Sequence, residues 1–276
     1  MPPQRIVIHA GFHKTGTTSV QAVLKRNRRE LWPVMAIGLR DKFESTLRAA
    51  RTYAEKRDTF NLHKAAYLFG KYVGDLNLSP KRQLLVSAED LSGCMAGRNG
   101  TTDYSAAPEL LQGYAEELQA LFGRRLELTF VMGTRAAPLW YPSAYWQHVK
   151  SSRMTESFDA FVERCPNAAD FATVLGDIRD AVPDHRVLTN DLDDCRDLPF
   201  GPATPILNLM RMPPERRAAL KPVELRNARG DDALLRAYLD LNRSDLDDAT
   251  VEARKKQLWV ERAAHGSGLL GGKETG

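Results

Sequence analysis

The sequence predicts an α/β protein with a central parallel sheet and helices on both faces of that sheet. Four short, largely apolar segments have the character of buried strands, and longer segments with helical character separate them. Glycine-rich or polar residues directly follow three of these strands. Such alternation is typical of parallel sheets, because a crossover helix must carry the chain back between parallel neighbours. The predicted strands are residues 5–10, 83–87, 126–134 and 185–189.

Helical segments outweigh the strands, so we expect a helix-rich, three-layer α/β fold. No internal repeat and no linker composition marks a domain boundary. We therefore expect one domain over residues 1–265 and a flexible C-terminal tail over residues 266–276, which are small and polar. The predicted helices are residues 16–29, 43–56, 62–76, 108–122, 138–150, 155–164, 168–181, 231–241 and 245–264.

Composition narrows the class of protein. A net charge of +4 suits a site for an anionic nucleotide but is too small to indicate nucleic-acid binding. The three cysteines (Cys94, Cys165 and Cys195) lack C-x-x-C spacing, so they predict neither disulfides nor a zinc site and fit a reducing cytoplasm. No apolar run has the roughly 18 residues that a membrane span needs, and we expect a cytoplasmic protein without an anchor. The basic residues 25–29 are interpreted as the solvated end of the first helix.

The first predicted strand runs directly into a loop and then into a helix. A strand, a tight loop and a helix N-terminus together form a phosphate-binding site, because backbone N–H groups and the helix dipole converge on the anion. Gly11 and Gly16 allow a close backbone approach, and Lys14 brings a cation. Hydroxyl groups follow at residues 17–19. The segment therefore predicts a P-loop-like phosphate site.

The position of the lysine distinguishes this loop from a Walker A loop. Walker A sequences read G-x-x-x-x-G-K-[ST], whereas here Thr17 follows the second glycine and Lys14 precedes that glycine by two residues. The Lys-Thr-Gly-Thr-Thr-Ser order at residues 14–19 resembles the 5′-phosphosulfate loop of sulfotransferases that use 3′-phosphoadenosine 5′-phosphosulfate (PAPS). Ser19 stands where many cytosolic members have tryptophan, so the likeness is to bacterial and carbohydrate-type members.

The third predicted strand leads into a second motif. Arg135 follows this strand, and Ser143 lies eight residues further on, in the next predicted helix. A guanidinium and a hydroxyl at this spacing can hold one phosphate from two sides. In sulfotransferases, the same arrangement of strand, arginine and serine binds the 3′-phosphate of PAPS. The resemblance spans residues 5–24, 83–91 and 126–150, and Arg226-Asn227-Ala228-Arg229-Gly230 only faintly echoes a late phosphate motif of cytosolic members.

The resemblance implies transfer of a sulfuryl group from PAPS to a hydroxyl or amine, leaving adenosine 3′,5′-bisphosphate, with no metal required. The acceptor would be a carbohydrate or another small molecule. Lys14 would stabilise charge on the leaving oxygen. The 5′-phosphate would be held by Thr15, Gly16, Thr17, Thr18 and Ser19. No feature of the sequence indicates the oligomeric state.

Glu89 is the leading candidate for a general base, because it follows the second predicted strand at the same edge of the sheet. The alternative is that Glu89 caps or forms an ion pair with the turn that follows. His13 is a weaker candidate and better suited to orienting the loop, while His9 is interpreted as a core histidine. Two other functions stay open: a P-loop kinase or other NTP-dependent transferase, and a nucleotide-binding protein without catalysis.

Two further segments have two interpretations each. Residues 91–107 are long and glycine-rich, which fits a lid or substrate contact and equally fits disorder. The aromatic residues Trp140, Tyr141, Tyr145 and Trp146 suit either an exposed acceptor surface or the buried face of a helix, and the buried face is favoured.

Overall fold

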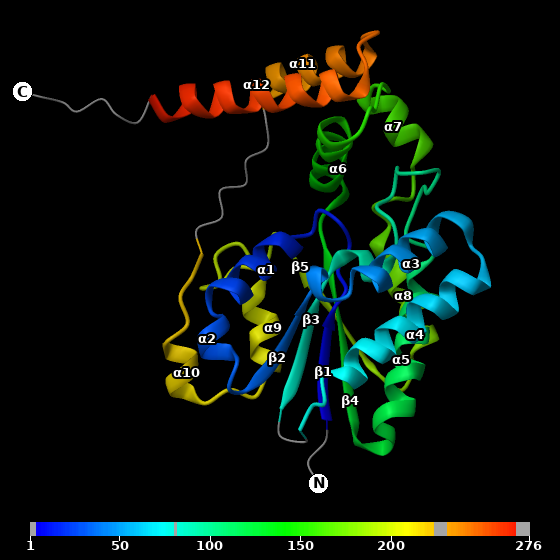
Figure 1. Ribbon diagram of the computed structural model, residues 1–276, viewed down its shortest axis with the longest axis vertical. Coiled ribbons are helices and arrows are strands. Elements are labelled where there is room, and N and C mark those ends of the chain that lie inside the picture. The colour runs from blue at the N-terminus through cyan, green and yellow to red at the C-terminus, as the bar shows by residue number, and fades with distance from the viewer. Residues whose placement is uncertain (1–3, 80–81, 224–230, 269–276) are drawn as a thin grey trace, which may run out of the picture. The chain divides into compact units, whose positions relative to one another are not determined.

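The computed structural model describes residues 4–79, 82–223 and 231–268 and has the predicted α/β architecture. Five parallel strands form one sheet in the order β2-β3-β1-β4-β5. Figure 1 shows this sheet between two groups of helices. The strands are β1 (Gln4–His9), β2 (Met35–Leu39), β3 (Gln83–Ser87), β4 (Leu126–Thr134) and β5 (Arg186–Asp191).

Sequence reasoning missed the edge strand β2. Its five residues, Met-Ala-Ile-Gly-Leu, include alanine and glycine, which are depleted in strands. The segment becomes a strand through pairing with β3, in a register that sets Ile37 opposite Leu85. Tertiary pairing therefore supplies what local propensity lacks.

Alternating side chains of the strands point to two helical layers. Val7, Leu85 and Val131 belong to one buried cluster together with apolar residues of α1 and α9. The helices on this side of the sheet are α1 (Thr17–Arg26), α2 (Arg28–Leu31), α9 (Ala203–Leu209) and α10 (Pro214–Ala218). Those on the other side are α3 (Glu44–Lys56), α4 (Thr59–Asp75), α5 (Ala107–Phe122) and α8 (Phe171–Ala181).

The helix predicted over residues 16–29 is two helices in the structure. Asn27 separates them, because its side-chain amide donates to the carbonyls of Val23 and Lys221 at 2.9 and 2.8 Å. This amide ends α1 and holds the segment that contains Lys221 against the end of the helix. The short helices α9 and α10 were not predicted either, because each is under two turns long and contains proline.

The glycine-rich segment after β3 is packed against the body of the protein. It begins with a short 3-10 helix, η2 (Glu89–Ser92), and it buries Cys94, Met95, Ala96 and Tyr104. The segment therefore belongs to the core, and the interpretation of residues 91–107 as disordered is wrong.

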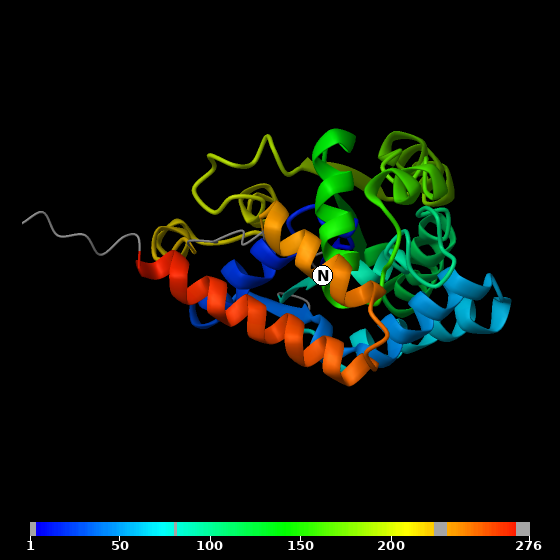
Figure 2. The ribbon, with the colours of Figure 1, turned by 90° about the horizontal axis from the view of Figure 1, so that it is seen from above.

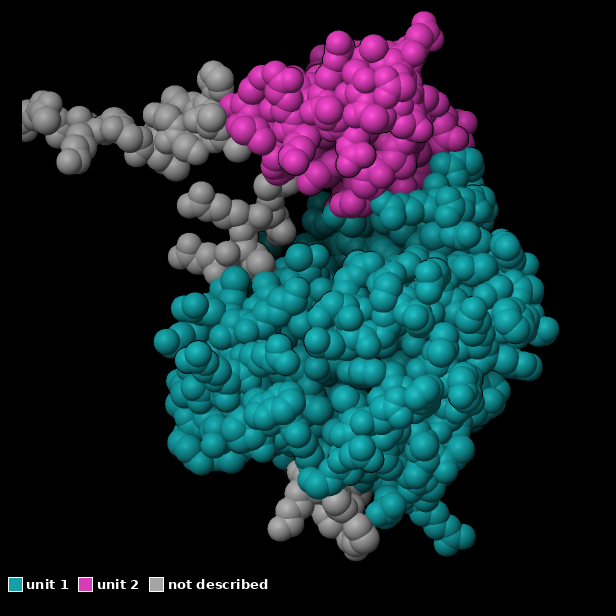
Figure 3. Space-filling model, in the orientation of Figure 1, with its two compact units in different colours: residues 1–140, 164–225 teal, residues 141–163, 226–276 magenta. Residues whose placement is uncertain are grey.

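The chain divides into two compact units, coloured separately in Figure 3. The first comprises residues 1–140 and 164–225, and the second comprises residues 141–163 and 226–276. The first boundary falls within helix α6 (Ala137–Ser151), where the sequence contains no linker. Residues 226–230 and 269–276, which include the faint phosphate motif and most of the expected tail, lie outside the described residues.

The second unit contains most of α6 together with α7 (Phe158–Arg164), α11 (Asp232–Arg243) and α12 (Asp248–Gly268). Figure 2 shows α11 and α12 side by side. Trp146 stacks on Tyr238 with ring centroids 5.5 Å apart, and Tyr145 is also buried. The buried-face interpretation is therefore confirmed for Trp140, Tyr145 and Trp146, whereas Tyr141 is half-buried. Among the described residues, no helix has both the length and the apolar character needed to cross a membrane.

Candidate functional site

The strand order creates a topological switch point at the carboxyl ends of β1 and β4. β1 is followed by a connection that leads to β2 on one side of the sheet, whereas the connection after β4 leads to β5 on the other side. Because β1 and β4 are neighbours, their following segments diverge between them, and open α/β sheets bind ligands at such switch points. The loop with Lys14 follows β1, and Arg135 follows β4.

Positive backbone angles shape the loop after β1. The φ angles of Gly11, Lys14 and Gly16 are 40°, 67° and 96°. Lys14 is thus a non-glycine residue in the left-handed region, a conformation that is strained and often found at functional sites. A side chain at Gly16 would meet Leu192 and Pro202, because an added Cβ would lie 2.7 Å from Leu192 Cδ1. The positive φ angle therefore favours glycine there, and any larger residue would also displace the Leu192 side chain.

The loop rests directly on the end of β4. The Phe12 N–H donates to the Gly133 carbonyl at 3.3 Å. A Cβ at Gly133 would lie 2.5 Å from Thr15 Oγ1, so only glycine allows this close approach. The hydroxyl of Thr15 is turned inward and donates to the Phe12 carbonyl at 2.5 Å. Thr15 therefore fastens the loop through its side chain, and only its backbone N–H remains for a ligand.

The N-terminus of α1 has hydrogen-bond donors to spare. Within the described part of the chain, the backbone N–H groups of Gly16, Thr17 and Thr18 have no acceptor. The first turn of α1 contains no acidic residue, and Gly16 offers no side-chain cap. Free N–H groups and the positive end of the helix dipole make this turn suited to an external anion.

The side chains around this turn differ in burial. Thr17 is buried and its hydroxyl has no hydrogen-bond partner in the described structure. Thr18 is exposed, Ser19 is buried, and Lys14 is half-buried. A Cβ added to Gly11 would lie 3.1 Å from the Thr17 hydroxyl oxygen. Thr17 is thus the hydroxyl of the loop that is most clearly in need of an acceptor or donor.

His9 is buried at the end of β1, as predicted for a core histidine. Its Nδ1 lies 2.9 Å from the Ser87 hydroxyl of β3, whereas its Nε2 has no partner in the described structure. Burial lowers the pKa of His9 to about 4, so the ring is neutral near pH 7.

Arg135 lies one residue beyond β4 and is half-buried. Its Nε is buried without a hydrogen-bond partner, and no described carboxylate pairs with its guanidinium. Ser143 is half-buried in α6 and belongs to the second compact unit, so its pairing with Arg135 stays a prediction. An arginine with an unused buried donor is the kind of group that a phosphate satisfies.

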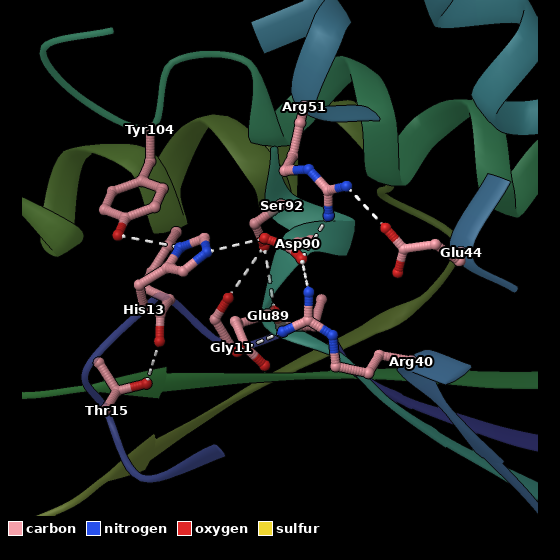
Figure 4. A network of polar contacts seen from close by, with 12 residues as sticks. Gly11, His13, Thr15, Arg40, Glu44, Arg51, Glu89, Asp90, Ser92 and Tyr104 are labelled. Atoms are coloured by element: carbon pink, nitrogen blue, oxygen red, sulfur yellow. Dashed lines mark hydrogen bonds and ion pairs between the residues drawn. The ribbon is translucent and has the colours of Figure 1, made fainter. Parts of the chain in front are cut away.

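On the other side of β1, a polar network centres on the buried carboxylate of Asp90 (Figure 4). The carboxylate oxygens lie 3.0 Å from His13 Nε2, 2.7 Å from Arg51 Nη1 and 3.0 Å from Arg40 Nη2. Burial acts to raise the pKa of Asp90, but the hydrogen bond from His13 and the charges of Arg51 and Arg40 outweigh it and bring the pKa to about 2. Asp90 is therefore a fixed negative charge.

Asp90 is a site residue that sequence reasoning missed. The one signal available was its place next to Glu89, just after β3. Its partners come from β1's loop, from the residue after β2 and from α3, so no local spacing brings them together. Because β2 was not predicted, the position of Arg40, which directly follows this strand, could not be predicted either.

His13 has hydrogen-bond partners at both ring nitrogens and at its backbone carbonyl. Its Nδ1 lies 3.3 Å from the buried Tyr104 hydroxyl, and its Nε2 is engaged by Asp90. The Trp140 indole N–H donates to the His13 carbonyl at 2.8 Å. With both ring nitrogens occupied, His13 fixes the loop, which is the role that sequence reasoning favoured for it.

Glu89 lies at the same edge of the sheet with part of its side chain in solvent. Its Oε1 is 3.7 Å from Arg40 Nη1, and Gln21 Nε2 donates to its Oε2 over 3.4 Å. The same Gln21 amide bonds the Ser87 carbonyl at 3.2 Å. Glu89 therefore pairs with Arg40, which follows β2, and not with the turn after β3 that the alternative named; its carboxylate, 19% exposed, lies at the rim.

No family model matches the chain, and no curated protein is significantly similar to it in sequence. Among the described residues, no group of three or more His, Cys, Asp or Glu side chains is arranged to hold a metal ion.

Proposed function

We propose that this protein is a PAPS-dependent sulfotransferase that acts on a hydroxyl or amine of a carbohydrate or small molecule. The observation that carries the proposal is the set of unused donors at the carboxyl ends of β1 and β4. Backbone N–H groups of residues 16–18 and the Thr17 hydroxyl lie on one side, and the Arg135 guanidinium follows the neighbouring strand. Two separate donor groups suit a ligand with two separate phosphates.

Each donor group has a distinct role in this proposal. The N-terminal turn of α1, from Thr15 to Ser19, would hold the 5′-phosphate through backbone N–H groups and the Thr17 hydroxyl. Arg135 would hold the 3′-phosphate, and the contribution of Ser143 stays a prediction from the sequence pattern. The bound donor supplies an activated sulfuryl group, and the Lys14 ammonium would stabilise the charge that grows on the oxygen that it leaves.

Glu89 is the better candidate for the general base. Both nitrogens of the His13 ring are engaged, whereas Glu89 presents a carboxylate that Gln21 and Arg40 orient from two sides. A base must reach the acceptor hydroxyl directly, and partial exposure at the rim meets that requirement.

A kinase or other NTP-dependent transferase would use the same loop to bind a nucleoside triphosphate. The free N–H groups of α1 serve either ligand equally, but Thr17 stands at the Walker A lysine position and Arg135 has no counterpart in that motif. A nucleotide-binding protein without catalysis would also use these donors. Binding and turnover measurements separate the three functions.

Calorimetry on the full-length protein tests the donor. We expect adenosine 3′,5′-bisphosphate to bind more tightly than adenosine 5′-monophosphate or Mg-ATP. Arg135→Ala should weaken bisphosphate binding by about 2 kcal/mol, or roughly 30-fold, while changing monophosphate binding little. Arg48→Ala, which removes an exposed arginine of α3, is the matched control and should leave both affinities unchanged.

Three outcomes would contradict the proposal. Mg-ATP binding more tightly than the bisphosphate would favour the kinase. Equal losses for both adenosine nucleotides in Arg135→Ala would remove the 3′-phosphate assignment. Bisphosphate binding with no sulfuryl transfer to any acceptor in a broad radiolabelled-PAPS screen would leave a binding protein. Where transfer occurs, Lys14→Ala and Glu89→Gln should lower kcat more than donor affinity.

A further inference from the structure

A basic hollow lies at the far end of α1 from the loop after β1. Its volume is about 510 Å³, and exposed side chains of α1, α2 and the residue that follows α2 line it. These residues are Lys25, Arg26, Arg28, Arg29 and Trp32. Figure 1 shows α2 at the end of α1 that is remote from the carboxyl ends of the strands. The hollow thus gathers four positive charges, and we refer to it below as the basic hollow.

None of these four cations forms an ion pair with a carboxylate of the described residues. Some exposed cations elsewhere do, for example Lys71 with Asp75 at 2.7 Å and Arg211 with Glu127 at 3.3 Å. The helix dipole accounts for Lys25 and Arg26, which lie in the last turn of α1. It does not account for Arg28 and Arg29, because α2 has only four residues and its dipole is correspondingly small.

The exposed indole of Trp32 orients guanidinium groups beside the hollow. The Arg82 guanidinium lies 4.1 Å from the indole ring centroid, and that of Arg28 lies 5.9 Å from it. Arg82 also donates to the Trp32 carbonyl over 3.3 Å, yet its Nε is buried without a hydrogen-bond partner. Stacking on an aromatic face holds an arginine in place and leaves its N–H groups available to an anion.

We propose that the basic hollow is a second ligand site, which binds a compact polyanion carrying several phosphate or sulfate groups. Its volume lies in the range of small-molecule sites, and planar guanidinium groups match tetrahedral oxyanions through paired hydrogen bonds. The site is independent of the proposed donor site. The ten residues of α1 separate the two by about 15 Å.

Titration of the full-length protein with two probes tests this inference. Tripolyphosphate represents phosphorylated ligands, and sucrose octasulfate represents sulfated sugars. We expect at least one of them to bind, with an affinity that falls as salt rises, and the tighter probe identifies the source chemistry. The doubly reversed variant Lys25→Glu/Arg29→Glu should lose about 100-fold or more, since each charged contact is worth about tenfold.

The matched control is Arg48→Glu/Lys56→Glu on α3, which changes the net charge equally through two exposed cations. It should stay within about threefold of the wild type, which excludes a general effect of net charge. Adenosine 3′,5′-bisphosphate affinity should be unchanged in the Lys25→Glu/Arg29→Glu protein. The milder Lys25→Gln/Arg29→Gln variant repeats the test without introducing repulsion.

The inference is overturned if neither probe binds, or if the control loses as much affinity as the Lys25→Glu/Arg29→Glu protein. Tighter binding of single-stranded DNA or of anionic lipid vesicles than of both probes would also overturn it, because the occupant would then be a macromolecule or a membrane. A failure of PAPS binding would leave the basic hollow untouched, so the two proposals can fail separately.

Discussion

The two sides of β1 differ in how their polar groups are satisfied. On the β3 side, the Asp90 carboxylate is surrounded by His13, Arg40 and Arg51, and each contact is a short hydrogen bond. On the β4 side, the Thr17 hydroxyl and Arg135 Nε are buried without partners. Buried polar groups in folded proteins are nearly always paired. The Asp90 network therefore acts as a frame, and under the proposed function a ligand would supply the partners that the Thr17 hydroxyl and Arg135 Nε lack.

His9 lies on the boundary between these sides and has one nitrogen on each. Its Nδ1 meets Ser87 of β3, while its Nε2 faces the loop near Gly11 and has no partner among the described residues. The buried His9 ring therefore has one nitrogen with a hydrogen-bond partner and one without. The difference predicts that removal of a charged partner on the β3 side reduces stability, whereas removal of the unpaired Arg135 on the β4 side reduces ligand binding.

The largest effect should follow Asp90→Asn. The substitution leaves the guanidinium groups of Arg40 and Arg51 without their buried counter-charge, and loss of one partner from a buried pair is strongly destabilising. We expect the free energy of unfolding to fall by about 3 kcal/mol in urea titrations. Asp75→Asn, which breaks an exposed pair with Lys71, should cost less than about 0.5 kcal/mol. Equal effects of the two variants would refute the framework role of Asp90.

Comparison of the wild type with Asp90→Asn also gives a prediction about the pH dependence of stability. Because the pKa of Asp90 is lowered to about 2 in the folded protein, its contribution is present above its unfolded value near 3.8 and is lost as pH falls through 2. The stability difference between wild type and Asp90→Asn should therefore shrink between pH 4 and 2. The neutral ring of His9 favours folding above pH 6.5, and that contribution declines towards pH 4. It is common to both proteins and cancels in their difference.

Gly133→Ala should have the next largest effect and should act mainly on the loop. The new Cβ would lie 2.5 Å from Thr15 Oγ1 and 3.3 Å from the Thr15 carbonyl oxygen, so the loop must move. We expect a loss of about 2 kcal/mol in stability and a larger loss in affinity for adenosine 3′,5′-bisphosphate. Gly176→Ala in α8 is the control, since nothing lies within 4 Å of the new methyl group.

Gly176→Ala should leave nucleotide affinity unchanged and raise stability by about 0.5 kcal/mol, because alanine is the better helix former. If Gly133→Ala bound the nucleotide as tightly as the wild type, the loop seated on β4 could not be part of the donor site.

Local sequence patterns predicted the frame of the fold because the relevant physics is local. Four strands have apolar runs dense enough to be recognised alone, and the loop after β1 has a spacing that fixes its path. β2 escaped detection because Ala36 and Gly38 weaken its strand pattern and only its pairing with β3 makes it a strand. The Asp90 network escaped for a related reason, since its members are 39 to 77 residues apart in sequence.

The candidate site shows the same division between local and tertiary information. Lys14, Glu89 and Arg135 could be placed at the sheet edge from the residues that follow each strand. The partners of the His13 ring, Tyr104 and Asp90, are 91 and 77 residues away in sequence, so no local pattern indicates that both of its nitrogens are engaged. Position was therefore predictable from sequence, while side-chain roles depended on packing.

The smallest effect on stability should follow Arg135→Ala, and this is the sharpest test of the contrast between the two sides. Arg135 makes no hydrogen bond or ion pair in the described structure, and its buried Nε is unsatisfied. Its removal should change the free energy of unfolding by less than about 0.5 kcal/mol, since no interaction is lost. Arg51→Ala, the same substitution on the β3 side, should cost about 1–2 kcal/mol because Asp90 and Glu44 both lose a charged partner. Nucleotide titrations should reverse the ranking, with Arg135→Ala impaired and Arg51→Ala near wild type. If Arg135→Ala proved less stable than Arg51→Ala, Arg135 would be a structural residue. The carboxyl ends of β1 and β4 would then be packed protein interior and not a ligand site.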